Sequence, residues 1–493
     1  MLIGIDIGSS GVKAALVDGT SGVLATARHE VALHSPASGW AEADPADWWR
    51  GVCATVRELF SGQRIDPAAV DAVACSGMVP AVLAIDGGGR PLRRAILQND
   101  ARATAELDEL APMLSDLDLV QLTGSALTQQ SVAPTLRWIS RHEPEVFART
   151  TGIVGSYDWV ARQLGAEAHV ERNWAIESGL YKLDGQLLEP LLDRAEVDAR
   201  LLPPVRDPAA LVGEVSAAAA EQTGLRAGTP IVVGGADHVL SAYGAGLLSA
   251  GDWLIKLGGA GDILVVTEDA VLDARLYLDA HPAGQWLPNG CMATSGSLVR
   301  WLAALAGGGT PLDALDAEAA ATPPGAGGVI CLPYFLGEKS PLQDPRLRGA
   351  FVGLHLGHGR AHLHRAALEA VAFGFRHHVE VFDERCVALG VARVTNGGSE
   401  SRLWKQILAD VLGVPLLPVL HHPGAAFGAA MAAGVGSRAV PGWDAVGPLV
   451  ELGEAYEPRK RYRELYDEHY AIYRELGTAL APASHRLSAE GLQ

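Results

Sequence analysis

An α/β fold in two domains is predicted from three observations. Short apolar runs, such as 72–75, 82–85 and 230–233, alternate with helical stretches, such as 45–59 and 133–141. Alternation of this kind is typical of sheets covered by helices. The chain has 493 residues, of which 48% are hydrophobic, and this is enough to bury a core in each of two or more domains. The third observation is a glycine-rich hairpin that occurs twice.

The first hairpin opens the chain. Residues 2–17 form two predicted strands around the turn Gly8-Ser9-Ser10-Gly11. About 250 residues later the pattern recurs at 253–266, around the turn Gly258-Gly259-Ala260-Gly261. Either an internal duplication or two unrelated hairpins would explain the repetition. We place a domain boundary where glycine-rich sequence precedes the second hairpin, which gives domains of residues 1–246 and 247–493.

Most elements after the second hairpin are predicted from period and length. Apolar runs at 328–332, 393–396 and 416–419 predict strands, and residues 360–384 and 401–412 predict helices.

The last segment predicts an amphipathic helix over 457–476. Tyr462, Tyr466 and Tyr473 lie along one face of this helix, and charged residues lie along the other. We expect the tyrosine face to pack against a core.

The composition disfavours several classes of protein. The 39 Lys and Arg against 57 Asp and Glu give a formal charge of −18, which disfavours non-specific binding of nucleic acid. No basic region precedes the short apolar run at the N-terminus, so a signal peptide is not predicted. Prolines and glycines interrupt the longest uncharged stretch, 411–437, so a membrane span is not predicted either. The five scattered cysteines suit reduced thiols, and we expect a cytoplasmic protein.

The first hairpin combines groups that can bind phosphate. Asp6 lies on its first strand, Ser9 and Ser10 offer hydroxyl donors in the turn, and Lys13 adds a positive charge just beyond it. Backbone N–H groups of small residues such as Gly8 can approach an anion closely. A plain tight turn is the alternative interpretation, since no Walker A loop is present.

A second candidate is Asp237, which follows a predicted buried strand. It stands in the run Gly234-Gly235-Ala236-Asp237-His238. Open α/β sheets place catalytic acids and bases at the ends of such strands, and the glycines leave room for a substrate. The alternative is a solvated aspartate in a turn.

A third candidate is the run from Asn396 to Ser401, which joins a predicted strand to a helix. Its glycine pair would let a nucleotide base or ribose lie flat against the backbone, although helix capping alone would explain the serines. The histidines of the run 355–364 include a pair with helical spacing, His358 and His362. We favour a polar surface over a metal site there, because no cysteine or matched carboxylate pattern accompanies them.

Taken together, these pieces resemble the FGGY family of carbohydrate kinases over nearly the whole chain. The most specific match runs from Gly349 to Glu369, where the second signature of the family is reproduced position by position. Other family-like segments are GIDIGSSGVK from Gly4, GWAEADP from Gly39, AILQND from Ala95, LPYFLGEKSP from Leu332 and GGSESRLWKQ from Gly397. Within the family, the spacing is most similar to that of the xylulokinase branch.

The resemblance implies an α/β fold of two actin-like, ribonuclease H-like domains with a central cleft that closes over ATP and a sugar. It implies that Asp237 is the general base and that Asp6 helps to hold Mg²⁺ through its waters. The implied phosphate and nucleotide positions are Gly8, Ser9, Ser10, Lys13, Gly258, Gly259, Gly296, Arg300, Gly398 and Arg402. The implied sugar positions are Met78, Val79, Asn99 and Asp237. A homodimer is the family-based expectation for assembly.

Two departures from the family pattern bear on the chemistry. Xylulokinases usually have Met-His where Met78-Val79 stands and Trp where Gln98 stands, so a hydrogen-bond partner of the sugar is missing. The family's Gly-Thr-Ser-Gly is replaced in the second turn by Gly-Gly-Ala-Gly, which removes hydroxyl donors near the γ-phosphate.

We therefore expect an ATP-dependent kinase of a small sugar, most simply a pentulose such as D-xylulose. A kinase of another ketose or polyol, such as D-ribulose, L-ribulose, gluconate, erythritol or glycerol, is the alternative within the same class. A non-catalytic actin-like nucleotide-binding module is the alternative from another class.

Overall fold

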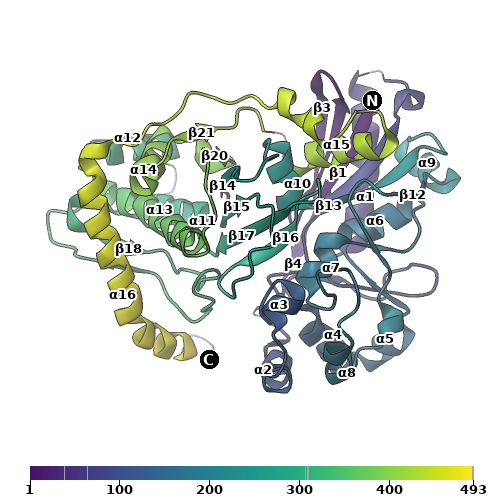
Figure 1. Ribbon diagram of the computed structural model, residues 1–493, viewed down its shortest axis with the longest axis horizontal. Helices are drawn as coiled ribbons and strands as arrows, with labels where there is room; N and C mark the ends of the chain where they lie inside the picture. Colours follow the sequence, from purple (N-terminus) through teal and green to yellow (C-terminus); the bar gives the residue numbers. More distant parts are fainter. Residues whose placement is uncertain (38, 64, 306, 308–309, 423, 491–493) are drawn as a thin grey trace.

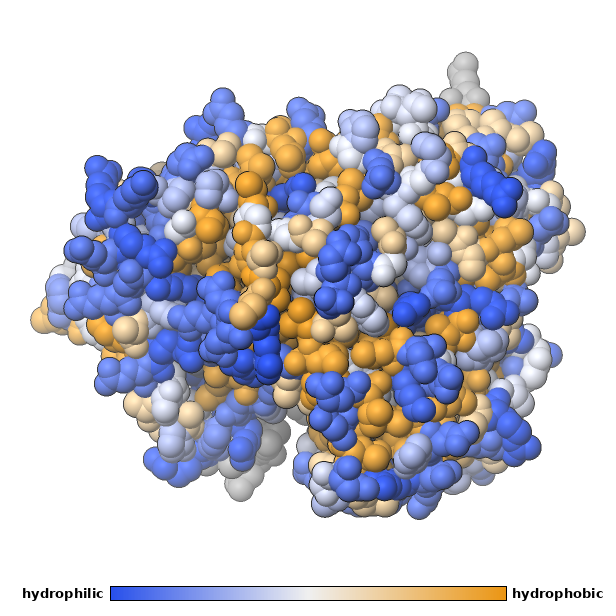
Figure 2. Space-filling view, in the orientation of Figure 1, coloured by the Kyte–Doolittle hydropathy of each residue, from blue (hydrophilic) through white to orange (hydrophobic). Residues whose placement is uncertain are grey.

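The computed structural model describes residues 1–493 except 38, 64, 306, 308–309, 423 and 491–493. It has two lobes, each built around a six-stranded sheet with helices against it (Figure 1). Figure 2 shows the same face as a surface on which hydrophilic and hydrophobic residues are mixed, with a notch between the lobes at its lower edge.

The first sheet has the order β12-β13-β6-β1-β2-β3. β1 pairs antiparallel with β2 and parallel with β6, and β6 pairs parallel with β13. The sequences of β1 and β6 are nearly continuous apolar runs because helices cover both faces of the sheet. The strands are β1 (Leu2–Ile7), β2 (Gly11–Asp18), β3 (Gly22–Glu30), β6 (Ala72–Gly77), β12 (Leu211–Glu214) and β13 (Pro230–Ala236).

The second sheet repeats this plan with the order β16-β17-β15-β14-β20-β21. β14 pairs antiparallel with β15 and parallel with β20, as β1 does with β2 and β6. The two glycine-rich hairpins therefore occupy the same place in two sheets of like topology, which is what an internal duplication predicts. The strands are β14 (Trp253–Leu257), β15 (Gly261–Val265), β16 (Tyr277–Ala280), β17 (Trp286–Met292), β20 (Ala392–Thr395) and β21 (Leu416–Pro418).

The predicted elements agree with the structure in kind, and apart from the last helix their ends differ by a few residues. The larger helices are α1 (Pro45–Gln63), α2 (Thr104–Met113), α4 (Val132–His142), α6 (Ser156–Leu164), α10 (Asp237–Gly244), α11 (Gly296–Leu305), α12 (Leu312–Ala320), α13 (Arg360–Glu384), α14 (Arg402–Leu412), α15 (Ala425–Ser437) and α16 (Arg463–Glu490). The shorter ones include α3 (Leu119–Thr123), α5 (Pro144–Arg149), α7 (Arg172–Ser178), α8 (Glu189–Ala195) and α9 (Ala217–Thr223). Small sheets are formed by β4 (Leu33–His34), β5 (Glu42–Ala43) and β8 (Ala95–Ile96), by β7 (Leu83–Ile85) and β9 (Gly152–Val154), by β10 (Val170–Glu171) and β11 (Val205–Arg206), and by β18 (Ile330–Leu332) and β19 (Ala350–Val352).

Helix α15 comes from the C-terminal half of the chain but packs on the first sheet, beside β1 and β6 (Figure 1). The approach is close enough that only glycine fits at the contact. A Cβ atom on Gly4 of β1 would lie 1.9 Å from the Ala426 carbonyl oxygen of α15. Helix α15 also packs closely against α10, where a Cβ atom on Gly428 would lie 2.1 Å from the Leu240 carbonyl oxygen. The chain therefore returns to the first lobe after building most of the second. The boundary between residues 246 and 247 stays a prediction.

Helix α16 begins later and ends later than the sequence predicts, at Arg463 and Glu490 instead of 457 and 476. Tyr466 and Tyr473 are buried in the core of the second lobe, as expected, and Tyr462 packs against its edge. The helix continues past residue 476 because Leu480 also packs against that core. Among the described residues, no helix combines the length and the apolar character needed to cross a membrane.

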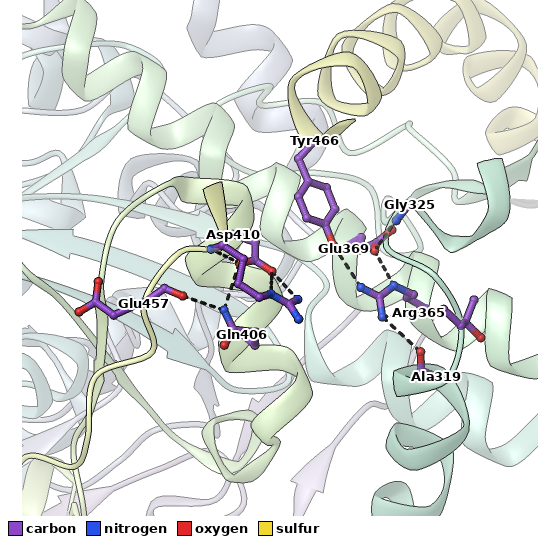
Figure 3. Close-up of polar contacts among 10 residues, drawn as sticks. Ala319, Gly325, Arg365, Glu369, Gln406, Asp410, Glu457 and Tyr466 are labelled. Atoms are coloured by element: carbon purple, nitrogen blue, oxygen red, sulfur yellow. Dashed lines mark hydrogen bonds and ion pairs between the residues drawn. The ribbon is translucent and has the colours of Figure 1, made fainter. Parts of the chain in front are cut away.

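A buried polar network joins α16 to α13 (Figure 3). The Arg365 guanidinium donates to the Glu369 carboxylate at 2.8 Å and to the carbonyl of Ala319 at 3.2 Å. The Tyr466 hydroxyl donates to Glu369 at 3.0 Å, and so does the Gly325 N–H. The side chains of Arg365 and Glu369 are each 2% exposed. Glu369, which ends the second family signature, therefore has a structural role in this network.

We expect Arg365→Met to lower the free energy of unfolding by about 3–5 kcal/mol, because it leaves the buried Glu369 carboxylate without its cation. Arg360→Met on the same helix is the matched control. Its partner Glu318 is at the surface, so we expect a loss of about 0–1 kcal/mol. Urea denaturation followed by tryptophan fluorescence measures both, and equal losses would contradict the role of the network.

Candidate active site

Three parallel strands of the first sheet end at one edge, and predicted site residues follow each of them. Ile7 of β1 and Ala236 of β13 both lie opposite Gly77 of β6. The residues that come next are therefore neighbours at the carboxyl edge of the sheet, where open α/β sheets bind ligands. They are Gly8, Met78 and Asp237.

The first hairpin holds an acid and a base opposite each other. Asp6 on β1 is the register partner of Lys13 on β2, and the turn between them closes with a bond from the Gly8 N–H to the Gly11 carbonyl. Ser9, Ser10 and Lys13 are exposed, so their polar groups are available to a ligand. The Oδ1 atom of Asp6 is buried and has no hydrogen-bond partner among the described residues.

The pKa of Asp6 is raised to about 7. Burial is the main cause and the negative charge of Asp237 adds to it, while the positive charges of Lys13 and Lys256 oppose it. A further positive charge near Asp6 would therefore stabilise the ionised form of its carboxylate.

Asp237 is the first residue of α10, immediately after β13. Its side chain is 39% exposed. Burial alone would raise its pKa, but a hydrogen bond from His238 and the charge of Lys256 outweigh burial and hold the pKa below its ordinary value. Asp237 is therefore ionised at neutral pH and able to accept a proton.

His238 links the two lobes. Its Nε2 atom lies 2.7 Å from the Asp279 carboxylate on β16 and 3.5 Å from Glu177 on α7. The pKa of His238 is raised well above its ordinary value: burial opposes the charged form, but the charge of Asp279 and a hydrogen bond to Asp237 outweigh it. The ligand atoms of Glu177, His238 and Asp279 lie within 4.8 Å of one another. The ion pair of His238 with Asp279 already accounts for this grouping. Sequence reasoning missed it because its members are far apart in the chain.

A second contact between the lobes lies nearby. The Asn173 side chain donates to the Ala280 carbonyl at 3.0 Å and accepts from the Ala280 N–H at 2.7 Å. Asn173 is fully buried. This paired bond fixes α7 of the first lobe against β16 of the second, beside the Asp237 edge.

The second hairpin has a tighter turn than the first. Leu257 lies opposite Gly261, so three residues close it, whereas Ile7 lies opposite Val12 and four residues close the first. The start of α11 holds this turn in place: the Gly296 N–H donates to the Gly258 carbonyl at 2.9 Å, and the Ser297 hydroxyl donates to the Gly259 carbonyl at 2.9 Å. The turn's own N–H groups are thus held in a fixed orientation.

A pocket of about 970 Å³ opens in the second lobe beside this turn. All six predicted nucleotide positions of this lobe line it, namely Gly258, Gly259, Gly296, Arg300, Gly398 and Arg402. The pocket also has a wall from α12 that the sequence did not predict, formed by Leu312, Asp313, Asp316, Ala317 and Ala320. The spacing of these residues places them on one helix face, but nothing in the sequence indicates what that face meets.

The predicted sugar positions divide into two groups. Met78 and Val79 are buried, at the same sheet edge as Asp237. Asn99 is exposed, in the loop after β8, where its neighbour Asp100 pairs with Arg102 at 2.8 Å. Gln98 in the same loop has a buried Oε1 atom to which none of the residues described by the structure donates a hydrogen bond.

The histidines of the run 355–364 are engaged within the protein. His358 contacts the Gly327 carbonyl at 3.1 Å, His362 accepts from the Gly359 N–H at the start of α13, and His364 pairs with Asp316 at 2.8 Å.

Comparison with known proteins agrees with this geometry. The N-terminal domain of the FGGY family of carbohydrate kinases matches residues 1–244, and the C-terminal domain of the same family matches residues 247–437. The chain belongs to the FGGY family of carbohydrate kinases. It is an ATP-dependent sugar kinase with two actin-like, ribonuclease H-like domains, as the sequence predicted.

Three relatives of this FGGY kinase illustrate the likeness. The crystal structure of xylulose kinase from Rhodospirillum rubrum is 42% identical in sequence, with a TM-score of 0.91 over 98% of this chain and 99% of that one. L-xylulose/3-keto-L-gulonate kinase of Escherichia coli is 30% identical, covering 97% of each chain. Xylulose kinase of Bacillus subtilis is 28% identical, covering 97% of this chain and 98% of its own.

Proposed function

We propose that this FGGY kinase transfers the γ-phosphate of ATP to a hydroxyl group of a pentulose, with Asp237 as the general base. The observation that carries the proposal is the state of Asp237. It is a partly exposed carboxylate with a lowered pKa, at the sheet edge that it shares with the phosphate-binding turn of the first hairpin.

The reaction needs one base and one in-line displacement. Asp237 accepts the proton of the sugar hydroxyl, whose oxygen forms a new bond to the γ-phosphorus. The bond between that phosphorus and the bridging oxygen of the β-phosphate breaks, and its electron pair leaves with ADP. General-base assistance of this kind contributes about 10²–10⁴-fold to the rate.

Asp6 is suited to a magnesium ion. Its buried Oδ1 has no partner within the part of the chain that the structure describes, and a carboxylate whose pKa is raised to about 7 is stabilised by a cation. The ion would neutralise negative charge on the triphosphate. Asp6 would orient it through water, and Lys13 would stand on the neighbouring strand as a further positive charge.

The pocket of the second lobe supports the nucleotide assignment. Gly397 and Gly398 follow β20 and leave space for a flat base or ribose, and Arg300 and Arg402 supply cationic groups at the wall. The pocket adjoins the second turn, so a nucleotide bound there would direct its phosphates toward the cleft between the hairpins.

The relatives support a pentulose of the xylulose type as the sugar, since xylulose kinases and an L-xylulose/3-keto-L-gulonate kinase occur among their names. Val79 offers no hydrogen bond where xylulokinases usually have an imidazole. The unpartnered Oε1 of Gln98 is a polar group available for a sugar hydroxyl. We infer that Gln98 takes part in sugar recognition and that the preferred pentulose is one other than D-xylulose.

A panel of sugars tests the activity. ADP release should be stimulated by at least one compound among D-xylulose, L-xylulose, D-ribulose, L-ribulose, 3-keto-L-gulonate, gluconate, erythritol and glycerol. We expect the highest kcat/KM with a pentulose and a lower value for D-xylulose than for the best substrate. The absence of any sugar-stimulated ADP release would contradict the proposed function, and the highest kcat/KM with D-xylulose would contradict the inference from Val79 and Gln98.

Asp237→Asn should lower turnover by at least about 10²-fold, because the amide cannot accept the hydroxyl proton. Its ATP affinity should change little, since the nucleotide pocket lies in the other lobe. Asp108→Asn, at an exposed position on α2, is the control and should keep the wild-type turnover. Near-normal turnover in Asp237→Asn would remove Asp237 from its role.

Gly397→Val should weaken ATP binding by at least about tenfold, because the new side chain projects into the pocket and displaces ligand contacts. Apart from its chain neighbours, no described residue has an atom within 4 Å of the position that a Cβ would take, so the fold should persist. Gly62→Val, an equally open position in α1, is the control and should bind ATP normally. Isothermal titration measures both, and equal affinities would place the nucleotide elsewhere.

A further inference from the structure

Lys256 stands in the second hairpin where Asp6 stands in the first. Asp6 precedes its turn by two residues on β1, and Lys256 precedes its turn by two residues on β14. Each has an oppositely charged register partner on the next strand, Lys13 on β2 and Asp262 on β15. The two hairpins therefore place an acid and a lysine opposite each other at the same positions, with the two residue types exchanged between the strands. In the second hairpin the two side chains form an ion pair.

The lysine is held in place and charged. Its Nζ atom lies 3.2 Å from the Asp262 carboxylate, and its side chain is 12% exposed. Burial would lower the pKa of Lys256, but the charges of Asp262 and Asp237 outweigh burial and raise it. At neutral pH it is an ammonium ion with a fixed direction.

The ammonium ion acts electrostatically on carboxylates of the first lobe. Its charge lowers the pKa values of both Asp237 and Asp6, which belong to the other lobe. The pKa of His422 is lowered to about 4, mainly by burial, and the positive charges of Lys256 and Lys13 add to the effect. Lys256 and Lys13, which belong to opposite lobes, therefore both lower the pKa values of Asp6 and His422.

The second turn lacks the hydroxyl donors that the family usually places there. Gly258, Gly259 and Ala260 offer only backbone N–H groups to a phosphate. A buried ammonium ion at the end of β14 would supply the missing stabilisation, because a charge-assisted bond to phosphate is about twice as strong as a neutral one.

We propose that Lys256 is a catalytic residue that contacts the γ-phosphate from the second lobe, opposite Lys13, and replaces the hydroxyl donors absent from the turn Gly258-Gly259-Ala260-Gly261. This role rests on the phosphoryl-transfer site proposed above. It gives the enzyme one lysine from each hairpin, and both neutralise negative charge that develops on the transferred group.

The competing role for Lys256 is that of a counter-ion for Asp262, and the test separates the two. The single variant Asp262→Asn removes that carboxylate and serves as the reference. Adding Lys256→Met to it then leaves no unpaired carboxylate at position 262. Relative to the reference, K256M/D262N should lose about 10²-fold or more in kcat with the best sugar. Lys460→Met, at an exposed lysine of the second lobe, is the control for loss of a positive charge.

A binding measurement tests the contact between Lys256 and the γ-phosphate without requiring turnover. The affinity for the β,γ-imido analogue of ATP should fall about tenfold or more in K256M/D262N, whereas that for ADP, which has no γ-phosphate, should stay within about twofold of the reference. The pair K256Q/D262N repeats both measurements with a polar, uncharged side chain in case the methionine variant does not fold.

Two results would overturn the role of Lys256. One is turnover in the double variants equal to that of Asp262→Asn, and the other is an equal change in affinity for ADP and for the imido analogue. If neither the wild type nor Asp262→Asn phosphorylates any sugar, the proposed function fails, and the comparison of the two nucleotides still decides whether Lys256 contacts the γ-phosphate.

Discussion

The site depends on opposite charges held together at the ends of the central strands. Burial raises the pKa of Asp6, and the negative charge of Asp237 adds to this effect. Lys13 and Lys256 oppose it, one from each lobe. The balance leaves Asp237 ionised, while a further cation would stabilise the ionised form of Asp6. The proposed base and the proposed magnesium-binding carboxylate can therefore have different roles at one site.

This balance requires the two lobes to be placed accurately relative to each other. Asn173 and His238 join them with buried polar contacts to β16, close to Asp237. On the other side, α15 carries the chain back to the first sheet, where its small residues allow backbone contact with β1. The proposed base and the proposed nucleotide pocket belong to different lobes, so these contacts would set the distance over which phosphate is transferred.

Much of the fold was predictable because it is local. The hairpins, the apolar strands and α13 follow from glycine-rich turns and hydrophobic period, and their predicted ends are close to those observed. The topology of the second sheet follows once the repeated hairpin is taken as a duplication. The return of α15 to the first sheet could not be predicted in this way, because its helix is apolar on every side and its period indicates no particular partner.

The sequence by itself determined the kinds of groups at the site: an acid and a lysine around the first turn, an aspartate after a buried strand, and glycines where a nucleotide could approach the backbone. Only the tertiary structure decided which of these groups share an electrostatic environment. Lys256, Asp279 and the α12 wall of the pocket carry no local signal, because their significance lies in neighbours that are far away in the chain. A pKa shift or an ion pair between lobes depends on burial and distance, and both are set by the packing of the two sheets.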